Sequence, residues 1–214
     1  MHHPDSFIDE VTEEVRRDKL FATFRKYGWI GLVAVVAIVG GASWIEYQKA
    51  SDRAAAQDLG DTLVAAMAQD DAAARVAALD GAGAAGDAGA IAALLAAGES
   101  DGAEAAARYQ AVAENMALPD SYRQLATIRM VVAQGADAPA ATRRAALEPL
   151  AAPGQPFRPI VLEQLALIAT EEGDTDTAIA HLREAIAASD ATAGLRQRAS
   201  QLIVALGGSL DDPS

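Results

Sequence analysis

The sequence predicts an all-α protein in which one membrane-spanning helix near the amino end is followed by a short solenoid of paired helices. Two observations lead to this prediction. Hydrophobic residues make up 51% of the chain and aromatic residues only 5%, and most of the apolar content is alanine, the strongest helix former. After residue 48 apolar and polar residues do not alternate as in strands, and turn residues separate windows of helical length.

Composition also excludes several classes of function. The 214 residues carry a net charge of −13. Residues 1–28 hold five basic and six acidic side chains, so the remainder carries −12. An acidic body repels phosphate backbones, which excludes nucleic acid as a partner and favours basic polypeptides through electrostatic attraction. Cysteine is absent, so disulfides, zinc–thiolate sites and cysteine nucleophiles are excluded.

An uncharged segment near the amino end has the length of a membrane span. No charged residue occurs from Tyr27 to Ile45, and a helix of about 19 residues is roughly 28 Å long, close to the thickness of bilayer hydrocarbon. Trp29 and Trp44 lie near its two ends, where interfacial aromatic residues are found. A core helix of a soluble protein would carry a polar stripe, and this segment has none. We therefore predict a transmembrane signal-anchor helix over residues 27–47.

Small residues fall on one side of this predicted span. Ala34, Ala37 and Gly41 are separated by three and four residues, which places them near one helix face. Small residues in such positions permit close contact with another membrane helix. The same spacing also arises by chance in a segment that is rich in alanine and glycine.

The flanking charges predict the orientation of the span. Basic residues crowd the segment from Arg16 to Lys26, whereas only Lys49 and Arg53 follow closely on the other side. The positive-inside rule then keeps residues 1–26 in the cytoplasm, as an amphipathic segment that lies on the membrane or docks a partner, and exports the carboxyl-terminal body. Small residues at signal-peptidase spacing leave cleavage as an alternative, but the long leading segment and the long apolar run favour an anchor.

The exported body is predicted to span residues 48–208, with a disordered tail at 209–214. Its first helix continues from the span to about residue 68, and the glycine-rich run over residues 80–90 is expected to be a flexible loop between helices. Later breaks occur at glycine, proline and aspartate pairs. Helix-sized windows between such breaks indicate antiparallel helix pairs.

One pair is much clearer than the others. The segment "PIVLEQLALIATEEGDTDTAIAHLREAIAASD", residues 159–190, contains two helical windows separated by a turn glycine. Each window has one apolar face, and the two faces are expected to pack together. The packing positions are Leu162, Leu165, Ala166, Gly173, Ala178, Leu182 and Ala185. This pattern resembles a tetratricopeptide repeat. The expected turn glycines Gly98, Gly135 and Gly173 are 37 and 38 residues apart, slightly more than the usual repeat length of about 34.

The whole layout resembles the YfgM-like family of single-span inner-membrane proteins. The resemblance rests on the basic segment "EEVRRDKLFATFRKYGW", the span, and the block "ALEPLAAPGQPFRPIVLEQLALIATEEGD". It implies an ancillary subunit of the Sec translocon that works with a membrane-anchored periplasmic chaperone, in a bacterial inner membrane with the body in the periplasm. It implies no catalytic residues.

Residues suited to catalysis or metal binding are few. The histidines are His2, His3 and His181, and no serine or cysteine nucleophile is placed near them by the sequence. Acidic residues gather at the Gly173 turn, but they lack the spacing of a calcium-binding EF-hand loop, so capping and solvation explain them. We therefore expect no enzyme, cofactor or metal.

Three functions remain for comparison. The first is a membrane-tethered module that binds polypeptides beside a translocon. The second is a structural accessory subunit of another inner-membrane complex, for example a respiratory one. The third is a periplasmic enzyme, which the absence of a nucleophile–base pair in the sequence disfavours.

Overall fold

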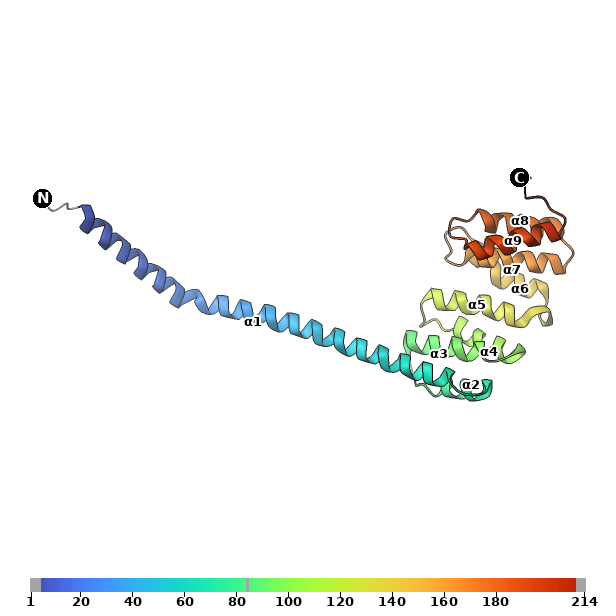
Figure 1. Cartoon of the computed structure of the whole chain (residues 1–214), viewed down its shortest axis with the longest axis horizontal. Coiled ribbons are helices and arrows are strands. Elements are labelled where there is room, and N and C mark those ends of the chain that lie inside the picture. The colour runs from blue at the N-terminus through green and yellow to red at the C-terminus, as the bar shows by residue number, and fades with distance from the viewer. Residues whose placement is uncertain (1–4, 84, 211–214) are drawn as a thin grey trace. The chain divides into compact units, whose positions relative to one another are not determined.

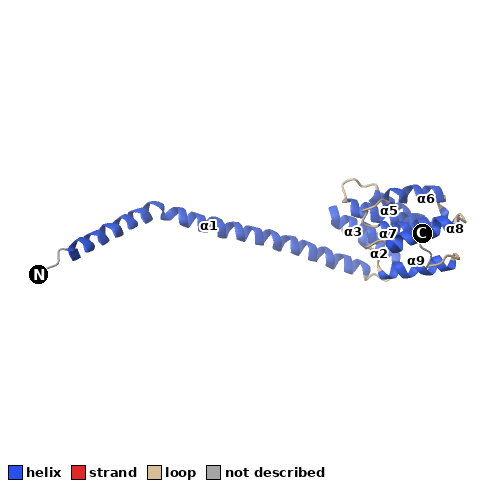
Figure 2. Ribbon diagram, turned by 90° about the horizontal axis from the view of Figure 1, so that it is seen from above, coloured by secondary structure: helices blue, strands red, loops and turns tan. Residues whose placement is uncertain are grey.

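The computed structural model describes the backbone of residues 5–83 and 85–210, and the side chains of residues 25–210 except at 27, 28 and 84. Within these residues it contains nine α-helices, two short 3₁₀ helices and no strand (Figure 2). The all-α prediction is therefore confirmed for the described part. The amphipathic character expected of residues 1–26 depends mostly on side chains outside the described ones, and residues 211–214 of the expected tail also lie outside them.

The first helix, α1, runs from Asp5 to Met67. Its residues up to Asp58 form one unit, and the rest of the chain from Leu59 forms a second, compact unit. All described side chains from Trp29 to Asp58 are exposed. Of the described helices, α1 alone contains a segment long and apolar enough to cross a membrane, which is consistent with a single-pass anchor or a signal sequence.

The compact unit, here called the body, begins with the last turns of α1. Eight further helices follow, and each packs mainly on its neighbours in the chain (Figure 1). Their bounds are α2 (Ala72–Asp80), α3 (Gly86–Gly98), α4 (Gly102–Ala113), α5 (Asp120–Gln134), α6 (Ala140–Leu147), α7 (Arg158–Glu171), α8 (Thr175–Ala187) and α9 (Ala193–Ala205). The 3₁₀ helices η1 (Gly135–Asp137) and η2 (Glu148–Ala151) lie on either side of α6.

Side-chain caps explain where several helices start. The carboxylate of Asp71 accepts a 2.7 Å hydrogen bond from the backbone of Ala74 at the start of α2. Asp174 accepts one of 3.1 Å from Thr177 at the start of α8. These short polar side chains satisfy backbone amides that have no partner inside the helix. The α7–α8 turn also needs Gly173, whose φ of +78° disfavours other residues.

Two expectations about glycines are wrong. Part of the expected loop over residues 80–90 is helical, because α3 begins at Gly86. Ala90 and Ala92 are only 3% and 6% exposed, and their burial together with alanine's helix propensity outweighs the cost of the glycines. Gly98 is not a turn glycine but the last residue of α3. The positive φ in this connection belongs to Gly102, at +53°.

Buried positions recur with a constant register along the odd-numbered helices. Ala92, Ala126, Val161 and Leu195 occupy α3, α5, α7 and α9 at successive separations of 34, 35 and 34 residues, and all four are buried. A second series at the same separations consists of Ala96, Met130, Leu165 and Ala199. On α5, α7 and α9, positions of these two series belong to apolar clusters that include residues of the preceding helices.

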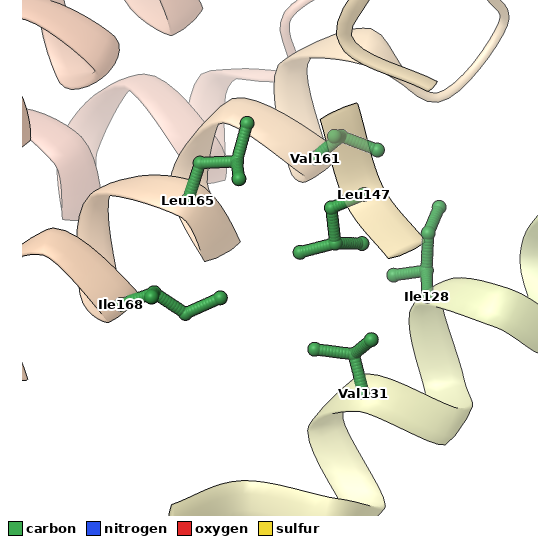
Figure 3. Packing of buried hydrophobic residues seen from close by; sticks show 6 residues of the cluster. All are labelled: Ile128, Val131, Leu147, Val161, Leu165 and Ile168. Atoms are coloured by element: carbon green, nitrogen blue, oxygen red, sulfur yellow. The ribbon is translucent and has the colours of Figure 1, made fainter. Parts of the chain in front are cut away.

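The best-defined apolar cluster joins α5 to the α6–α7 region. Ile128 and Val131 of α5 face Val161, Leu165 and Ile168 of α7, with Leu147 of α6 between them (Figure 3). All six side chains are at most 5% exposed. Burial of branched apolar side chains is the main stabilising contribution here.

The end of α9 offers a test of close packing. A Cβ atom at Gly208 would lie 2.8 Å from Cγ2 of Ile203 and 3.0 Å from Cδ1 of Ile179. We expect Gly208→Ala to lower the free energy of unfolding by about 1–3 kcal/mol, because the neighbouring side chains must leave their positions. Gly194→Ala near the start of α9 is the control, since the nearest atom to its Cβ would be 3.7 Å away. Equal urea midpoints for the two variants would contradict the prediction.

Candidate interaction surface

Six of the seven residues predicted from the sequence to pack the clearest helix pair lie in the interior, whereas the turn residue Gly173 is exposed. Leu162, Leu165, Ala166, Ala178, Leu182 and Ala185 are at most 5% exposed. Ala166 and Ala178 belong to one cluster with Leu182, Ala199 and Ile203, so α7, α8 and α9 meet there. Their small side chains allow close helix approach while the larger ones fill the remaining space. These residues position the surface but do not form it.

The predicted anchor residues are exposed. Trp29 and Trp44 are 62% and 63% exposed, and nothing lies within 4 Å of the Cβ position of Gly41. Ala34 and Ala37 are likewise exposed. The rings of Trp44 and Tyr47 lie 6.3 Å apart between centroids, so this end of the apolar segment carries adjacent aromatic rings of the kind found at membrane interfaces.

One side of the odd-numbered helices is left uncovered by the body's own packing. Some residues of α7 pack against α5 and α6, and others pack against α8 and α9. Ile160, Gln164 and Leu167 belong to none of these apolar clusters. Equivalent positions on the other helices are also exposed or half-buried; among them, Leu95 packs in part against the cluster of Ala66 and Leu79. We call this set the open stripe: Ile91, Leu95 and Gly98 of α3; Leu125, Arg129 and Val132 of α5; Ile160, Gln164 and Leu167 of α7; Gly194, Arg198 and Gln201 of α9.

These positions lie on one side of the body. Helices α5 and α7 meet both near their starts and further along. Gln124 near the start of α5 donates a 3.0 Å hydrogen bond to Gln155 just before α7, and later residues of the two helices share one apolar cluster, so the helices run in the same direction. On both helices, each uncovered residue directly precedes a residue that contacts the preceding helices. One residue corresponds to about 100° of rotation, so the uncovered residues lie roughly a quarter turn away, in the same direction on both helices. Parallel helices with this register present their uncovered residues to the same side.

The open stripe is apolar at its centre. Val132, Ile160 and Leu167 are 49%, 43% and 39% exposed, and single exposed apolar residues are ordinary, but an aligned series is not. A recess of about 570 Å³ between α7 and α9 continues the stripe, with Leu167 and Leu202 in its wall. A surface of this kind can hold an apolar polypeptide segment.

Arginine–carboxylate pairs fasten the helices to one another. Arg143 on α6 is 5% exposed; it donates a 3.1 Å hydrogen bond to the carbonyl of Ala138 and binds both carboxylate oxygens of Glu171. Arg144 and Glu172 form a second pair beside it. These bonds connect α6 to the end of α7 and so help to hold α7 and its open-stripe residues in their orientation.

The acidic residues around the Gly173 turn have protein partners. Glu171 and Glu172 bind the two arginines of α6, and Asp174 caps α8. The hydrogen bond from Arg143 lowers the pKa of Glu171, and the hydrogen bonds from Thr177 lower the pKa of Asp174. His181 is half-buried on the same helix. Ion pairing and capping account for Glu171, Glu172 and Asp174.

These lowered pKa values predict acid sensitivity. A carboxylate whose pKa is lower in the folded state stabilises the fold above its unfolded pKa, and this contribution disappears as the pH falls through the folded pKa. Starting from ordinary values of 4.5 for Glu171 and 3.8 for Asp174, we expect the urea midpoint to fall as the pH drops below about 4.5. Glu171→Gln should show a shallower decline than the unchanged protein. Parallel declines would contradict the assignment.

Sequence reasoning missed the open stripe and the burial of Arg143. The signal for the stripe was present as the 34- and 35-residue separations of apolar positions, which the glycine spacing of 37 and 38 obscured. Nothing in the local sequence distinguishes Arg143 from its exposed neighbours. No protein-family model, curated protein or solved structure matches the chain.

Proposed function

We propose that this protein is a membrane-anchored module that binds polypeptides along the open stripe. The observation that carries the proposal is an aligned apolar series, centred on Val132, Ile160 and Leu167, which the body itself leaves uncovered. The resemblance to the YfgM-like family supports a place beside the Sec translocon, together with a membrane-anchored periplasmic chaperone. In this role the protein holds its partners and turns over no substrate.

The proposed arrangement is a single-pass anchor in a bacterial inner membrane, with the amino end in the cytoplasm and the body in the periplasm. The basic segment from Arg16 to Lys26 before the uncharged helix supports this orientation. Protease added to spheroplasts should digest the body and spare an amino-terminal tag. A soluble periplasmic form that begins near Ser43 would instead identify the apolar segment as a cleaved signal sequence.

We further propose that the body is a tetratricopeptide-like repeat array. The constant register of buried positions on α3, α5, α7 and α9, with separations of 34, 35 and 34 residues, supports this and is close to the usual repeat length. In such arrays each helix pair buries its apolar face only against its neighbours, and one face remains open to partners.

Binding of this kind should be modest. Micromolar affinity corresponds to about −8 kcal/mol, and a tethered module gains effective concentration from its anchor. Deleting residues 1–45 should therefore weaken association with partners in cells while the helical fold remains. Retention of full association by the soluble body would show that tethering contributes nothing.

Site-specific crosslinking tests where partners bind. A photo-crosslinking residue at position 167 should capture an exported polypeptide or a periplasmic chaperone. The matched control is position 116 in the loop after α4, because Met116 is 75% exposed but outside the open stripe. Equal capture at both positions would contradict the proposed surface.

The alternative is a structural accessory subunit whose span packs against another inner-membrane complex, such as a respiratory one. The aligned small residues Ala34, Ala37 and Gly41 favour this alternative, because they permit close packing of membrane helices. Copurification in mild detergent separates the two functions. Translocon and chaperone subunits support the binding module, whereas a respiratory or other complex recruited by the span alone supports the accessory subunit.

A further inference from the structure

The open stripe differs in charge from the rest of the body. Residues 59–210 contain 19 acidic and ten arginine side chains, yet the twelve positions of the open stripe include no acid and two arginines. One of these, Arg198, donates two hydrogen bonds of 2.9 Å to Glu163. Its charge is therefore balanced within the protein, which leaves Arg129 as the charge that determines what the stripe attracts.

Arg129 differs from the other arginines of the body. Within residues 59–83 and 85–210, each of the other nine donates a hydrogen bond to a carboxylate or a backbone carbonyl. Arg129 makes no hydrogen bond or ion pair with any described residue. A guanidinium has five donors and binds carboxylates strongly, so Arg129 keeps this capacity for a partner.

The surroundings of Arg129 combine this cation with apolar side chains and with the polar side chains of Ser100 and Tyr109. It lines a recess of about 210 Å³ with Val132 and Ala97, next to the α3–α4 turn. Leu125 lies one turn before it on the same side of α5. Asp101 also lines the recess but forms no ion pair with Arg129 in the described part of the chain. The recess therefore holds one cation and one carboxylate, next to the apolar positions Leu125 and Val132 of the open stripe.

We propose that the polypeptide bound along the open stripe is an apolar segment with an acidic side chain that pairs with Arg129. This inference rests on the proposed function and adds the chemistry of the partner. Because apolar positions continue on both sides of Arg129, the bound chain extends past the cation, which points to an internal Asp or Glu. The acidic excess of the whole body attracts basic segments at long range, but contact within the recess decides which segment stays bound.

Matched peptides test this pairing. The full chain in nanodiscs is applied to an array of apolar dodecamers, each made in three versions with Glu, Gln or Lys at the centre. We expect the Glu version to bind about fivefold more tightly than the Gln version, the upper end for an exposed ion pair. Arg129→Glu should reverse the order and favour Lys. The control Arg196→Glu makes the same charge change outside the open stripe and should keep Glu first.

Each outcome has a distinct meaning. If the unchanged protein prefers Lys, or if Arg129→Glu leaves the order of the three versions unaltered, the pairing is overturned and the proposed function stands. If no dodecamer binds in any version, the proposed function fails. Should Arg129→Glu not fold, as judged by circular dichroism, Arg129→Gln replaces it, and this milder variant must abolish the difference between the Glu and Gln versions.

Discussion

Replacing Leu182 by alanine is expected to lower the free energy of unfolding of the body by about 3 kcal/mol. Leu182 has no exposed surface and shares a cluster with Ala166, Ala178 and Ile203. Alanine side chains have no rotamers with which to move into the space that the substitution leaves. The cavity therefore stays largely open, which places the cost well within the range for buried leucines. Urea denaturation of the full chain in detergent, followed by far-ultraviolet circular dichroism, measures the change.

The matched control is Val204→Ala on α9. Val204 is 58% exposed, so its truncation should change the free energy of unfolding by less than about 0.5 kcal/mol. If Leu182→Ala costs no more than Val204→Ala, the three helices α7, α8 and α9 do not share a close-packed core. The comparison also tests the surface on which partners are proposed to bind, because these helices hold Leu167 in place.

The α7–α8 pair could be predicted from the sequence because its information is local. Leu162 and Leu165 recur at helical spacing, Gly173 supplies the positive φ, and Asp174 is the preferred type of residue for a helix start. Leu182 then falls on the apolar face of α8 that packs against α7. Ile186, four residues further along α8, is only partly buried against the same cluster.

The surface could not be predicted because it depends on register between helices. Arg129 is one of ten arginines in the body, and only the pairing of the other nine sets it apart. Its neighbour in the recess, Ala97, precedes it by 32 residues and lies on another helix. The start of α3 at Gly86 was missed for a related reason. The glycines indicate a loop locally, whereas the burial of Ala90 against Val112 and Ala126 favours the helix.

Removing Glu171 should destabilise the body more than replacing its partner Arg143. The side chain of Arg143 is 6% exposed and that of Glu171 is 44% exposed. Glu171→Gln removes the countercharge of a buried guanidinium and one of its two acceptor oxygens, while the Ala138 carbonyl and the remaining amide oxygen can still accept. An uncompensated buried charge costs about 3 kcal/mol. Arg143→Met instead keeps the apolar stem and leaves a carboxylate that water reaches, at a cost of about 1 kcal/mol. The double substitution should recover most of the difference between the single variants.

The adjacent pair Arg144–Glu172 provides the control, because it joins the same two helices across the same sequence separation. Both of its side chains are 37% exposed, so Glu172→Gln should cost less than about 1 kcal/mol. Urea midpoints of the four variants are measured at pH 7 on the full chain. They show whether the loss of stability depends on the burial of the arginine or only on the presence of an ion pair at this junction. If Glu171→Gln and Glu172→Gln lower stability equally, Arg143 reaches water when its partner is lost. A larger loss for Glu171→Gln means that burial of Arg143 makes the α6–α7 junction depend on one carboxylate.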